Sequence, residues 1–216
     1  LVGLVVLAGV VLGGWRLGAA SGMLLLFVGL LGMWELAMVT LSQVLVAVFL
    51  ALLLGLPLGV WAAQSRKGRR SAVLRPILDF LQTIPAFVYL VPVIMLFNIG
   101  RVPGIMASVA YALPPVVRLT ELGIRQANRD AVEAARAFGS TTRQTLFKVQ
   151  LPLALPSILA GINQTTMMVL AMVVFAGMVG GAGLGLEAVN GLARNQLGQG
   201  IEEGLAIVIL AIVIDR

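Results

Sequence analysis

The stretch LAMVTLSQVLVAVFLALLLGLPLGVWAA occupies residues 36–63 and contains no charged side chain. An α-helix rises about 1.5 Å per residue, so this stretch would extend about 42 Å as a helix. That length is sufficient to cross the hydrocarbon core of a bilayer with some tilt. We therefore predict a membrane-spanning helix here and interpret the neighbouring sequence around it.

Further apolar stretches lie on both sides of this segment. They occupy residues 1–14, 17–34, 76–98, 102–117, 153–178 and 198–214. Of all residues, 60% are hydrophobic and 11% are charged, and the mean hydropathy is +1.04. A soluble domain is roughly half apolar and a quarter charged. The predicted fold class is therefore all-α, a polytopic bundle of at least five transmembrane helices.

Both ends of the sequence lie at apolar stretches. The first stretch has no charged leader before it, and the last residues follow directly on another apolar stretch. Signal peptides begin with a positively charged region. We therefore expect no signal peptide here and interpret the chain as part of a longer protein, with its first helix truncated.

The sequence contains neither His nor Cys. His-dependent catalysis, thiol nucleophiles, disulfides and the usual zinc sites all need these side chains. The phosphate-binding pattern G-x-x-x-x-G-K-[ST] is also missing, and the two lysines are Lys67 and Lys148. We therefore expect no catalytic residue, metal or cofactor in this chain and no ATPase site of its own, and the composition disfavours a membrane-embedded enzyme.

The basic residues indicate how the chain lies in the membrane. Eleven of the fifteen Lys and Arg residues fall within residues 66–75 and 118–148. Because Lys and Arg concentrate in cytoplasmic loops, both segments are predicted to face the cytoplasm, and the net charge of +6 needs no nucleic-acid partner. The turn at 99–101 and the glycine-rich region 177–200 are then expected outside. We interpret these glycines as a close-packed or flexible helix end; an outer gate is the alternative.

Prolines interrupt two of the apolar stretches. Pro85 and Pro92 lie in residues 76–98, and Pro114 and Pro115 are predicted to break the next helix near its inner end. Such breaks are tolerated where neighbouring helices or a water-lined cavity satisfy the freed backbone groups. The pattern is therefore consistent with ordinary kinked packing and equally with a bend beside a translocation path.

Asp79 is the one acidic residue that we place well inside an apolar stretch, and we expect it to pair with Arg75 four residues earlier. A secondary transporter or channel that couples to protons or ions would be expected to carry paired carboxylates within the membrane. The sequence therefore disfavours that alternative.

Residues 121–152 are too polar to lie within the membrane and have a helical pattern. Their small and apolar residues recur at three- and four-residue spacing and form one face, consisting of Ala131, Val132, Ala134, Ala135 and Phe138. Gly139 is predicted to end this helix, and Ser140 or Thr141 to cap a second one. The expected product is a helix–glycine–helix unit on the cytoplasmic side.

This unit resembles the EAA motif of ABC importer permeases. The resemblance is carried by Glu133-Ala134-Ala135, then Gly139 after three residues, then Val149, and then Leu151-Pro152. The family pattern has Ile at the position of Val149. The full spacing, on a basic segment between two membrane stretches, makes the resemblance specific.

The resemblance implies that the unit inserts into a groove of a separate ATPase subunit as a coupling helix. The residues implied in this coupling are Glu133, Ala134, Ala135, Arg136, Phe138, Gly139 and Arg143. The alanines would allow close approach, Gly139 the turn, and Phe138 an apolar anchor of the kind that dominates many interfaces. The two arginines would pair with acidic groups or only mark the cytoplasmic side, and Glu133 would hold the shape of the motif by accepting hydrogen bonds.

Other segments resemble one branch of this family, the permeases for quaternary-amine osmoprotectants such as glycine betaine and proline betaine. These segments are residues 56–61, 83–92, 112–120, 146–154 and 161–165. The resemblance implies additional transmembrane helices in residues 1–35 and a type I permease domain in residues 36–216, with the coupling segment at 121–152. Permeases for choline, carnitine, proline or amino acids remain the alternative.

Polar and aromatic residues deep in the apolar stretches are candidates for a translocation path. They are Tyr89, Tyr111, Asn163, Gln164 and Thr166. Counted along continuous helices, both tyrosines would lie near the middle of the bilayer, and aromatic faces attract quaternary ammonium groups. Core packing of the tyrosines, and helix–helix hydrogen bonds of Asn163 and Gln164, are the alternatives.

The resemblance also implies the partners and the location. The partners would be an ABC ATPase subunit that uses ATP, an extracytoplasmic substrate-binding protein and a second permease copy, within the lipid bilayer. The location would be the bacterial inner membrane, which the chain crosses several times.

Overall fold

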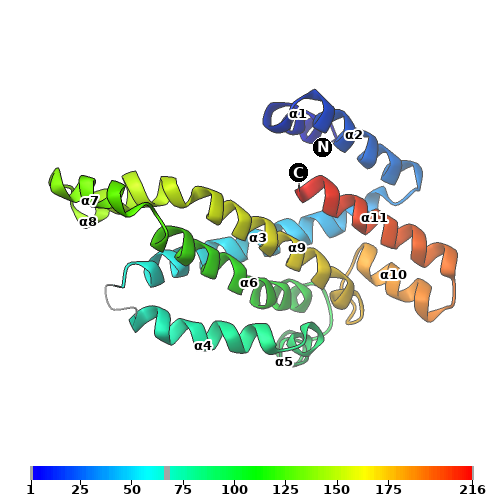
Figure 1. The fold of residues 1–216 in the computed structure, drawn as a ribbon. Helices are drawn as coiled ribbons and strands as arrows, with labels where there is room; N and C mark the ends of the chain where they lie inside the picture. The colour runs from blue at the N-terminus through cyan, green and yellow to red at the C-terminus, as the bar shows by residue number, and fades with distance from the viewer. Residues whose placement is uncertain (1, 66–68, 216) are drawn as a thin grey trace. The chain divides into compact units, whose positions relative to one another are not determined.

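The computed structural model describes residues 2–65 and 69–215, and within them all regular structure is helical. The elements, drawn in Figure 1, are α1 (Val2–Gly13), α2 (Trp15–Leu30), α3 (Trp34–Ala63), α4 (Arg69–Thr83), η1 (Ala86–Tyr89), α5 (Leu90–Phe97), α6 (Arg101–Arg125), α7 (Arg129–Ala137), α8 (Thr142–Thr145), η2 (Leu146–Gln150), α9 (Leu151–Gly177), α10 (Leu184–Ala193) and α11 (Leu197–Asp215). The predicted all-α class is confirmed.

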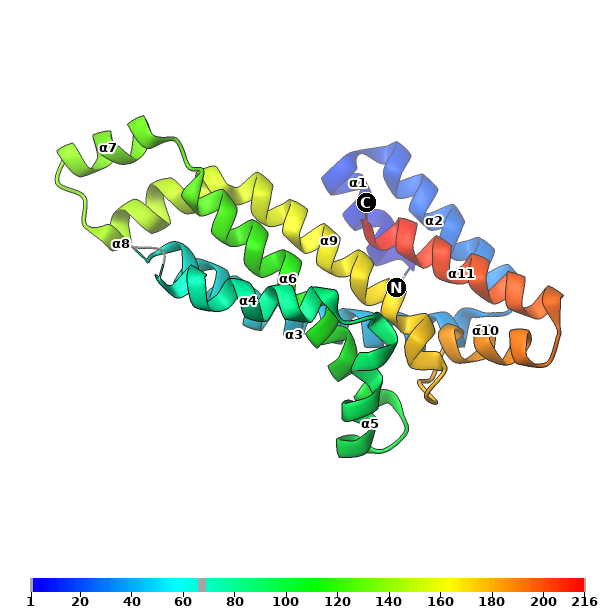
Figure 2. The same cartoon turned by 60° about the horizontal axis from the view of Figure 1, so that its bottom comes forward.

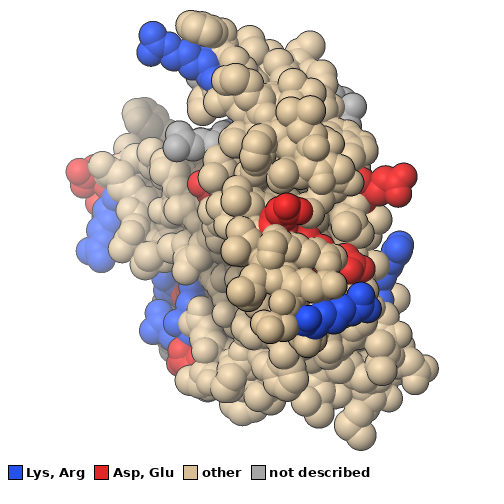
Figure 3. Space-filling model, turned by 90° about the vertical axis from the view of Figure 1, so that its right-hand side faces the viewer, with Lys and Arg blue, Asp and Glu red and all other residues tan. Residues whose placement is uncertain are grey.

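Within residues 2–65 and 69–215, four helical segments are long and apolar enough to cross a membrane: α3, α6, α11 and the continuous helix Thr142–Gly177 that joins α8, η2 and α9. A broken pair, α4 with η1 and α5, makes a fifth if it is one span. Helix α2 is shorter, with 16 residues. On the face drawn in Figure 3, most of the visible surface carries neither acidic nor basic side chains, as expected for helices that contact lipid.

The chain forms two compact units, which are described separately. Unit 1 contains Leu1–Ala47, Ala86–Ser108 and Thr166–Arg216. Its core joins α2 and the start of α3 to α10 and α11, and consists of Leu25, Val28, Met33, Ala37, Leu184, Ala206, Ile209 and Leu210. Helix α1 packs along α2, and α10 along α11.

The glycine-rich region contains a helix, α10, whose N-terminal end is hydrogen-bonded to α3. The hydroxyl of Thr40 accepts a hydrogen bond of 2.8 Å from the backbone amide of Leu184. The side-chain amide of Gln43 donates one of 3.1 Å to the backbone carbonyl of Ala182. A Cβ on Gly177 would lie 2.2 Å from the carbonyl oxygen of Gly185. The glycines therefore serve close packing, as one of the two interpretations predicted.

Unit 2 contains Val48–Pro85 and Val109–Thr165. Here α3 and α6 approach closely, because a Cβ on Gly55 would lie 2.3 Å from Val116 and one on Gly59 would lie 2.6 Å from Thr120. Two apolar clusters hold α3, α4, α6 and α9 together, one around Leu78, Val116 and Val117 and the other around Ile124, Leu146, Ala154 and Ile158.

The predicted break at Pro114 and Pro115 is wrong, since α6 continues unbroken to Arg125. Proline lacks an N–H, so each ring removes one hydrogen bond within the helix. The bonds removed are those to the carbonyls of Ala110 and Tyr111, four residues before each proline. The hydroxyl of Thr165 on α9 donates a bond of 3.1 Å to the next carbonyl, that of Ala112.

The interruption predicted at Pro85 is confirmed, whereas Pro92 interrupts nothing. Helix α4 ends at Thr83, and the chain continues through η1 into α5. Pro92 lies in the first turn of α5, where a missing N–H leaves no hydrogen bond unmade. The depth predicted for Tyr89 assumed a continuous helix, so that premise is wrong.

Candidate functional site

The helix–glycine–helix unit is present where the sequence predicts it, in unit 2, as α7 and α8 (Figure 2). Helix α7 begins after Asn128, whose side-chain oxygen accepts hydrogen bonds from the amides of Asp130 (2.8 Å) and Ala131 (3.2 Å). This is a typical N-cap, which satisfies amides that have no partner within the helix. The start of the unit is therefore fixed by the sequence next to it.

Helix α7 ends in a Schellman motif. The amide of Ser140 donates to the carbonyl of Ala135 at 3.0 Å, and the amide of Gly139 to that of Arg136 at 2.9 Å. Gly139 has a φ of +83°, a left-handed conformation that strains any residue with a Cβ. No atom lies within 4 Å of a Cβ built there, so within this chain the glycine is needed for its backbone conformation and not for space.

Helix α8 begins with a capping box, as one of the two predicted caps requires. Thr141 accepts a bond of 3.3 Å from the amide of Gln144, and the side chain of Gln144 accepts one of 2.8 Å from the amide of Thr141. The hydroxyl of Ser140 donates to the carbonyl of Ala135 and lies 3.3 Å from the hydroxyl of Thr145. The turn is thus held by hydrogen bonds on both sides of Gly139.

Phe138 points away from the chain, with 93% of its surface exposed. Beside it lies a shallow pocket lined by Ala135, Phe138, Gly139, Ser140, Gln144, Lys148 and Val149. A large aromatic side chain at the tip of a rigid turn costs free energy in water and is typical of a surface that a partner covers. Phe147, in η2, is also exposed, at 64%.

Three charged residues of the helix–glycine–helix unit were predicted to take part in the coupling. Arg136, Arg143 and Glu133 are all exposed, and within the described residues none of them forms an ion pair or a side-chain hydrogen bond. Glu133 was expected to hold the shape of the motif by accepting hydrogen bonds. Within the described residues, the hydrogen bonds that shape the motif involve Asn128, Ser140 and Thr141 instead. The three charged side chains are available to a partner.

A π-helical turn, η2, joins the unit to the membrane helix α9. Leu146 of this turn is buried in the same apolar cluster as Ile124 of α6. The side-chain amide of Gln150 donates a long bond of 3.5 Å to the backbone carbonyl of Ile124. Single π-turns within α-helices occur frequently at functional sites. The turn that follows the helix–glycine–helix unit is therefore continuous with α9 and packed against the end of α6.

Unit 2 also contains an ion-pair network that the sequence did not predict correctly. Asp79 of α4 pairs with Arg118 of α6. The predicted pair of Asp79 with Arg75 is wrong. Arg75 lies 3.9 Å from Glu121 instead. Spacing along one helix indicated a neighbour on that helix, whereas the tertiary fold supplies a closer cation from another.

Glu121 is the buried centre of this network, with its side chain 7% exposed. Its Oε1 accepts a hydrogen bond of 2.7 Å from Nε of Arg125, and Nη2 of Arg125 donates one of 3.1 Å to the carbonyl of Ala62 at the end of α3. Three helices therefore meet at one carboxylate. These groups line a cavity made of Arg75, Asp79, Arg118, Glu121, Leu122 and Arg125.

The candidate path residues are divided between the two units. Tyr89 and Thr166 are buried in unit 1, whereas Tyr111, Asn163 and Gln164 belong to unit 2, where the last two are exposed on α9. Thr165, next to them, donates its hydrogen bond to the backbone of α6. Neither of the cavities described in unit 2 is lined by any of the five.

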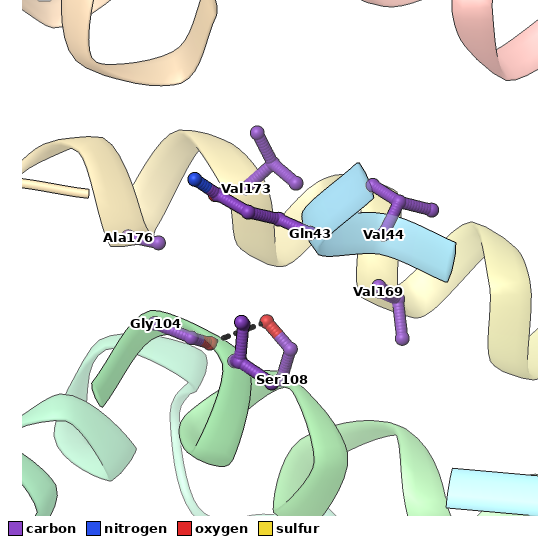
Figure 4. A pocket seen from close by; sticks show the side chains of 8 residues that line it. Gln43, Val44, Gly104, Ser108, Val169, Val173 and Ala176 are labelled. Atoms are coloured by element: carbon purple, nitrogen blue, oxygen red, sulfur yellow. Dashed lines mark hydrogen bonds between the residues drawn. The ribbon is translucent and has the colours of Figure 1, made fainter. Parts of the chain in front are cut away.

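Unit 1 contains a small recess between α3, α6 and α9 (Figure 4). It is lined by Gln43, Val44, Gly104, Ile105, Ser108, Val169, Val173 and Ala176. The hydroxyl of Ser108 donates to the carbonyl of Gly104 at 2.7 Å. The space holds roughly one water molecule, and none of the five predicted path residues lines it, so we do not consider it a substrate site.

Sequence reasoning missed Glu203 of α11, which is only 2% exposed. Its Oε1 accepts a hydrogen bond of 3.0 Å from the side-chain amide of Gln199, and its Oε2 has no hydrogen-bond partner within the described residues. The signal was present as the pair Glu202-Glu203 within an apolar stretch, and ionisable residues in such stretches usually face the interior of a bundle.

Comparisons with known proteins agree in family and fold. A family profile described as "Binding-protein-dependent transport system inner membrane component" matches residues 55–215. The chain is 51% identical over 203 residues to the glycine betaine/proline betaine transport system permease protein ProW of Escherichia coli (strain K12), a match that covers 94% of this chain and 57% of that protein. It is 53% identical over 191 residues to the glycine betaine transport system permease protein OpuAB of Bacillus subtilis (strain 168), covering 88% and 67%. The chain thus spans 57% of the length of the first relative.

A solved structure shares the fold. The MetNI methionine ABC transporter, in an inward-facing conformation, matches with a TM-score of 0.72 and 24% identity, over 85% of this chain and 89% of that one. This likeness concerns the fold alone. It confirms the predicted permease fold of type I importers.

Proposed function

We propose, starting from the fact that this chain belongs to the family of binding-protein-dependent transport system inner membrane components, that it is the permease subunit of an ATP-driven importer of quaternary-amine osmoprotectants. Glycine betaine and proline betaine are the substrates that we propose. The chain performs no chemistry in this function. It provides the membrane path and the surface through which a separate ATPase acts.

The observation that carries the proposal is the similarity to two transport permeases. They are 51% and 53% identical to this chain over 94% and 88% of its length, and both are named as permeases of glycine betaine transport systems. Permeases for other amines or amino acids share the coupling mechanism. They are therefore competitors for the identity of the substrate and not for the mechanism.

The partners proposed are an ABC ATPase subunit, a substrate-binding protein and a second permease copy. The exposed Phe138, together with the exposed Arg136 and Arg143 of the same helix–glycine–helix unit, supports an ATPase docking surface. An apolar anchor, with cations that have no ion pair within the described residues, fits an apolar groove with an acidic rim. ATP would be bound by that subunit. Glu133, Ala134 and Ala135 would lie along the contact, with Gly139 forming its turn.

The mechanism proposed is alternating access. When the ATPase subunits close around ATP, they would move α7 and α8, which hydrogen bonds at both ends hold as one body. Leu146 packs under Ile124, so this movement would reach α6 as well as α9. Movement of a rigid element against packed helices is a common way to switch between two states. Tyr89, Tyr111, Asn163, Gln164 and Thr166 remain our proposed path residues.

The proposal is tested by uptake of radiolabelled glycine betaine into proteoliposomes that contain the full-length permease, its ATPase and its binding protein. We expect uptake that requires ATP. We expect Phe138→Ala to lower it at least tenfold, because losing an interface anchor costs about 2 kcal/mol or more. Phe49→Ala is the matched control, since Phe49 is similarly exposed, at 63%, but lies within the apolar part of α3.

Each component of the proposal has its own contradicting result. Uptake that continues without the ATPase would exclude an ATP-driven importer. ATP hydrolysis that is stimulated by the binding protein, without betaine uptake, would keep the machinery and replace the substrate. Equal losses in Phe138→Ala and Phe49→Ala would contradict the docking role of Phe138.

A further inference from the structure

The cavity between α4 and α6 contains more cations than anions. It is lined by three guanidinium groups, those of Arg75, Arg118 and Arg125, and by only two carboxylates, those of Asp79 and Glu121. All five ionisable groups lie within unit 2. The described residues that line this cavity therefore carry an excess of positive charge.

Two of the three guanidinium groups have hydrogen-bonding capacity to spare. The Nε of Arg118 is buried and has no hydrogen-bond partner within the described residues. The side chain of Arg75 is 67% exposed and approaches Glu121 only to 3.9 Å, which is too far for a hydrogen bond. A buried donor without an acceptor is unfavourable, so an acceptor that reached this Nε, once the side chain of Arg118 moved to expose it, would be stabilised.

We propose that this cavity is a transient binding site for the carboxylate of a zwitterionic quaternary-amine substrate during its passage through the permease. The inference rests on the proposed function and names a site for it. Guanidinium groups bind carboxylates through two parallel N–H···O bonds. Arg118 offers its unused Nε to such a carboxylate, and Arg75 offers a second, mobile fork.

The other end of the zwitterion also has a counterpart in the cavity. A quaternary ammonium group has no N–H and is attracted by charge alone, and the side chain of Asp79 is 63% exposed at the same site. Leu122, which is 44% exposed, provides an apolar wall for the methyl groups. The substrate would thus replace the pair between Asp79 and Arg118, with its carboxylate on Arg118 and its ammonium facing Asp79.

Such an exchange involves little loss of stability. Arg118 and Asp79 are 38% and 63% exposed, and ion pairs of that exposure contribute only about 0–1 kcal/mol. Replacing one pair by two equivalent contacts gives weak binding. Weak binding is suitable for a path, because a transported molecule has to leave each site as readily as it enters.

The test is ligand-observed NMR by saturation transfer on the purified permease–ATPase complex without its binding protein. The three probes are glycine betaine, choline and 3,3-dimethylbutanoate. Choline keeps the ammonium but lacks the carboxylate, and 3,3-dimethylbutanoate keeps the carboxylate with carbon in place of the charged nitrogen. We expect glycine betaine to bind most tightly, 3,3-dimethylbutanoate next and choline least.

Two variants and one control locate the binding. Arg118→Lys keeps the charge beside Asp79 but lacks the fork and the buried Nε, and Arg75→Gln removes the exposed cation. Each is expected to weaken glycine betaine binding about tenfold, as the loss of a charge-assisted hydrogen bond does, with choline binding unchanged. Arg101→Gln, at the exposed start of the same helix, should have no effect.

Glycine betaine binding that is unchanged in both variants, or equal to that of choline, would overturn the inference, as would the absence of binding at the highest soluble concentration. ATP-driven uptake by the complete assembly separates this result from a failure of the proposed function. Normal glycine betaine uptake without binding at the cavity removes only this site. Stimulated ATP hydrolysis without glycine betaine uptake removes the proposed substrate.

Discussion

Arg125 donates a hydrogen bond of 2.7 Å from its Nε to Oε1 of Glu121, one helical turn earlier, and the same guanidinium reaches the carbonyl of Ala62 on α3. Glu121 also neutralises Arg75 of α4 across 3.9 Å. Three helices of unit 2, α3, α4 and α6, are therefore connected through Glu121 and its partner Arg125. Removing one partner of such a network leaves the others without compensation.

We predict that Glu121→Ala lowers the free energy of unfolding by roughly 1–3 kcal/mol, the usual penalty for leaving buried polar groups unpaired. Glu121→Gln keeps an oxygen that accepts from Arg125 and should lose less. The measurement is the fraction of detergent-purified protein that remains monodisperse after heating. Glu202→Ala, at an exposed position of α11, is the control, and a loss in this control equal to that of Glu121→Ala would contradict the prediction.

A second prediction concerns the left-handed conformation of Gly139. Alanine at φ +83° would cost about 1 kcal/mol or more, whereas asparagine tolerates this region. Because the space around the position is open, Gly139→Asn should keep more ATP-dependent uptake than Gly139→Val, in spite of its similar size. Equal activity of the two variants would show that the backbone conformation of Gly139 does not matter.

The capping box at α8 gives a third prediction. Thr141→Ala removes the side chain that accepts from the amide of Gln144 and should destabilise the start of α8 by about 1 kcal/mol. Hydrogen exchange of the amides in residues 142–145 should become about fivefold faster. Thr142→Ala, one residue later, is the matched control, because no hydrogen bond of its exposed hydroxyl is found within the described residues. The same acceleration in both variants would contradict the capping role.

A fourth prediction concerns the close approach between the end of α9 and α10. A methyl group on Gly177 would lie 2.2 Å from the backbone oxygen of Gly185, so Gly177→Ala forces the two segments apart. We expect a loss of roughly 1–3 kcal/mol in the free energy of unfolding, as for other overpacked positions. Gly198→Ala, which has no atom within 4 Å, should be neutral or slightly stabilising, since alanine favours helix. Thermal unfolding of both variants decides the matter, and a larger loss for Gly198→Ala would refute it.

Local signals could be read from the sequence. Gly139 was predicted to end one helix and Ser140 or Thr141 to cap the next. Gly139 and Thr141 do so, because caps depend on residues within four positions of each other. The membrane helix in residues 36–63 was equally predictable, because its length and composition are its own properties. The fold class followed from these local features.

Features that depend on distant residues could not be read in this way. Asp79 was assigned the nearest cation on its own helix, whereas its partner Arg118 is 39 residues away. The prolines of α6 were expected to break a helix that continues unbroken to Arg125 and packs closely against α3. Helix α10 was not predicted, because its sequence is rich in glycine. These glycines pack closely against the preceding segment, and that contact can be recognised only in the three-dimensional structure.

The π-helical turn Leu146–Gln150 has a geometrical consequence for the exposed unit. A π-turn contains one residue more than an α-turn, and each residue of an α-helix turns the chain by about 100°. Deleting one residue here would convert the joint to regular helix and swing Phe138 and its neighbours about 100° around the axis of α9. The direction in which the docking surface points is therefore set by the number of residues in the joint, and insertions or deletions there would re-aim it without altering a single contact side chain.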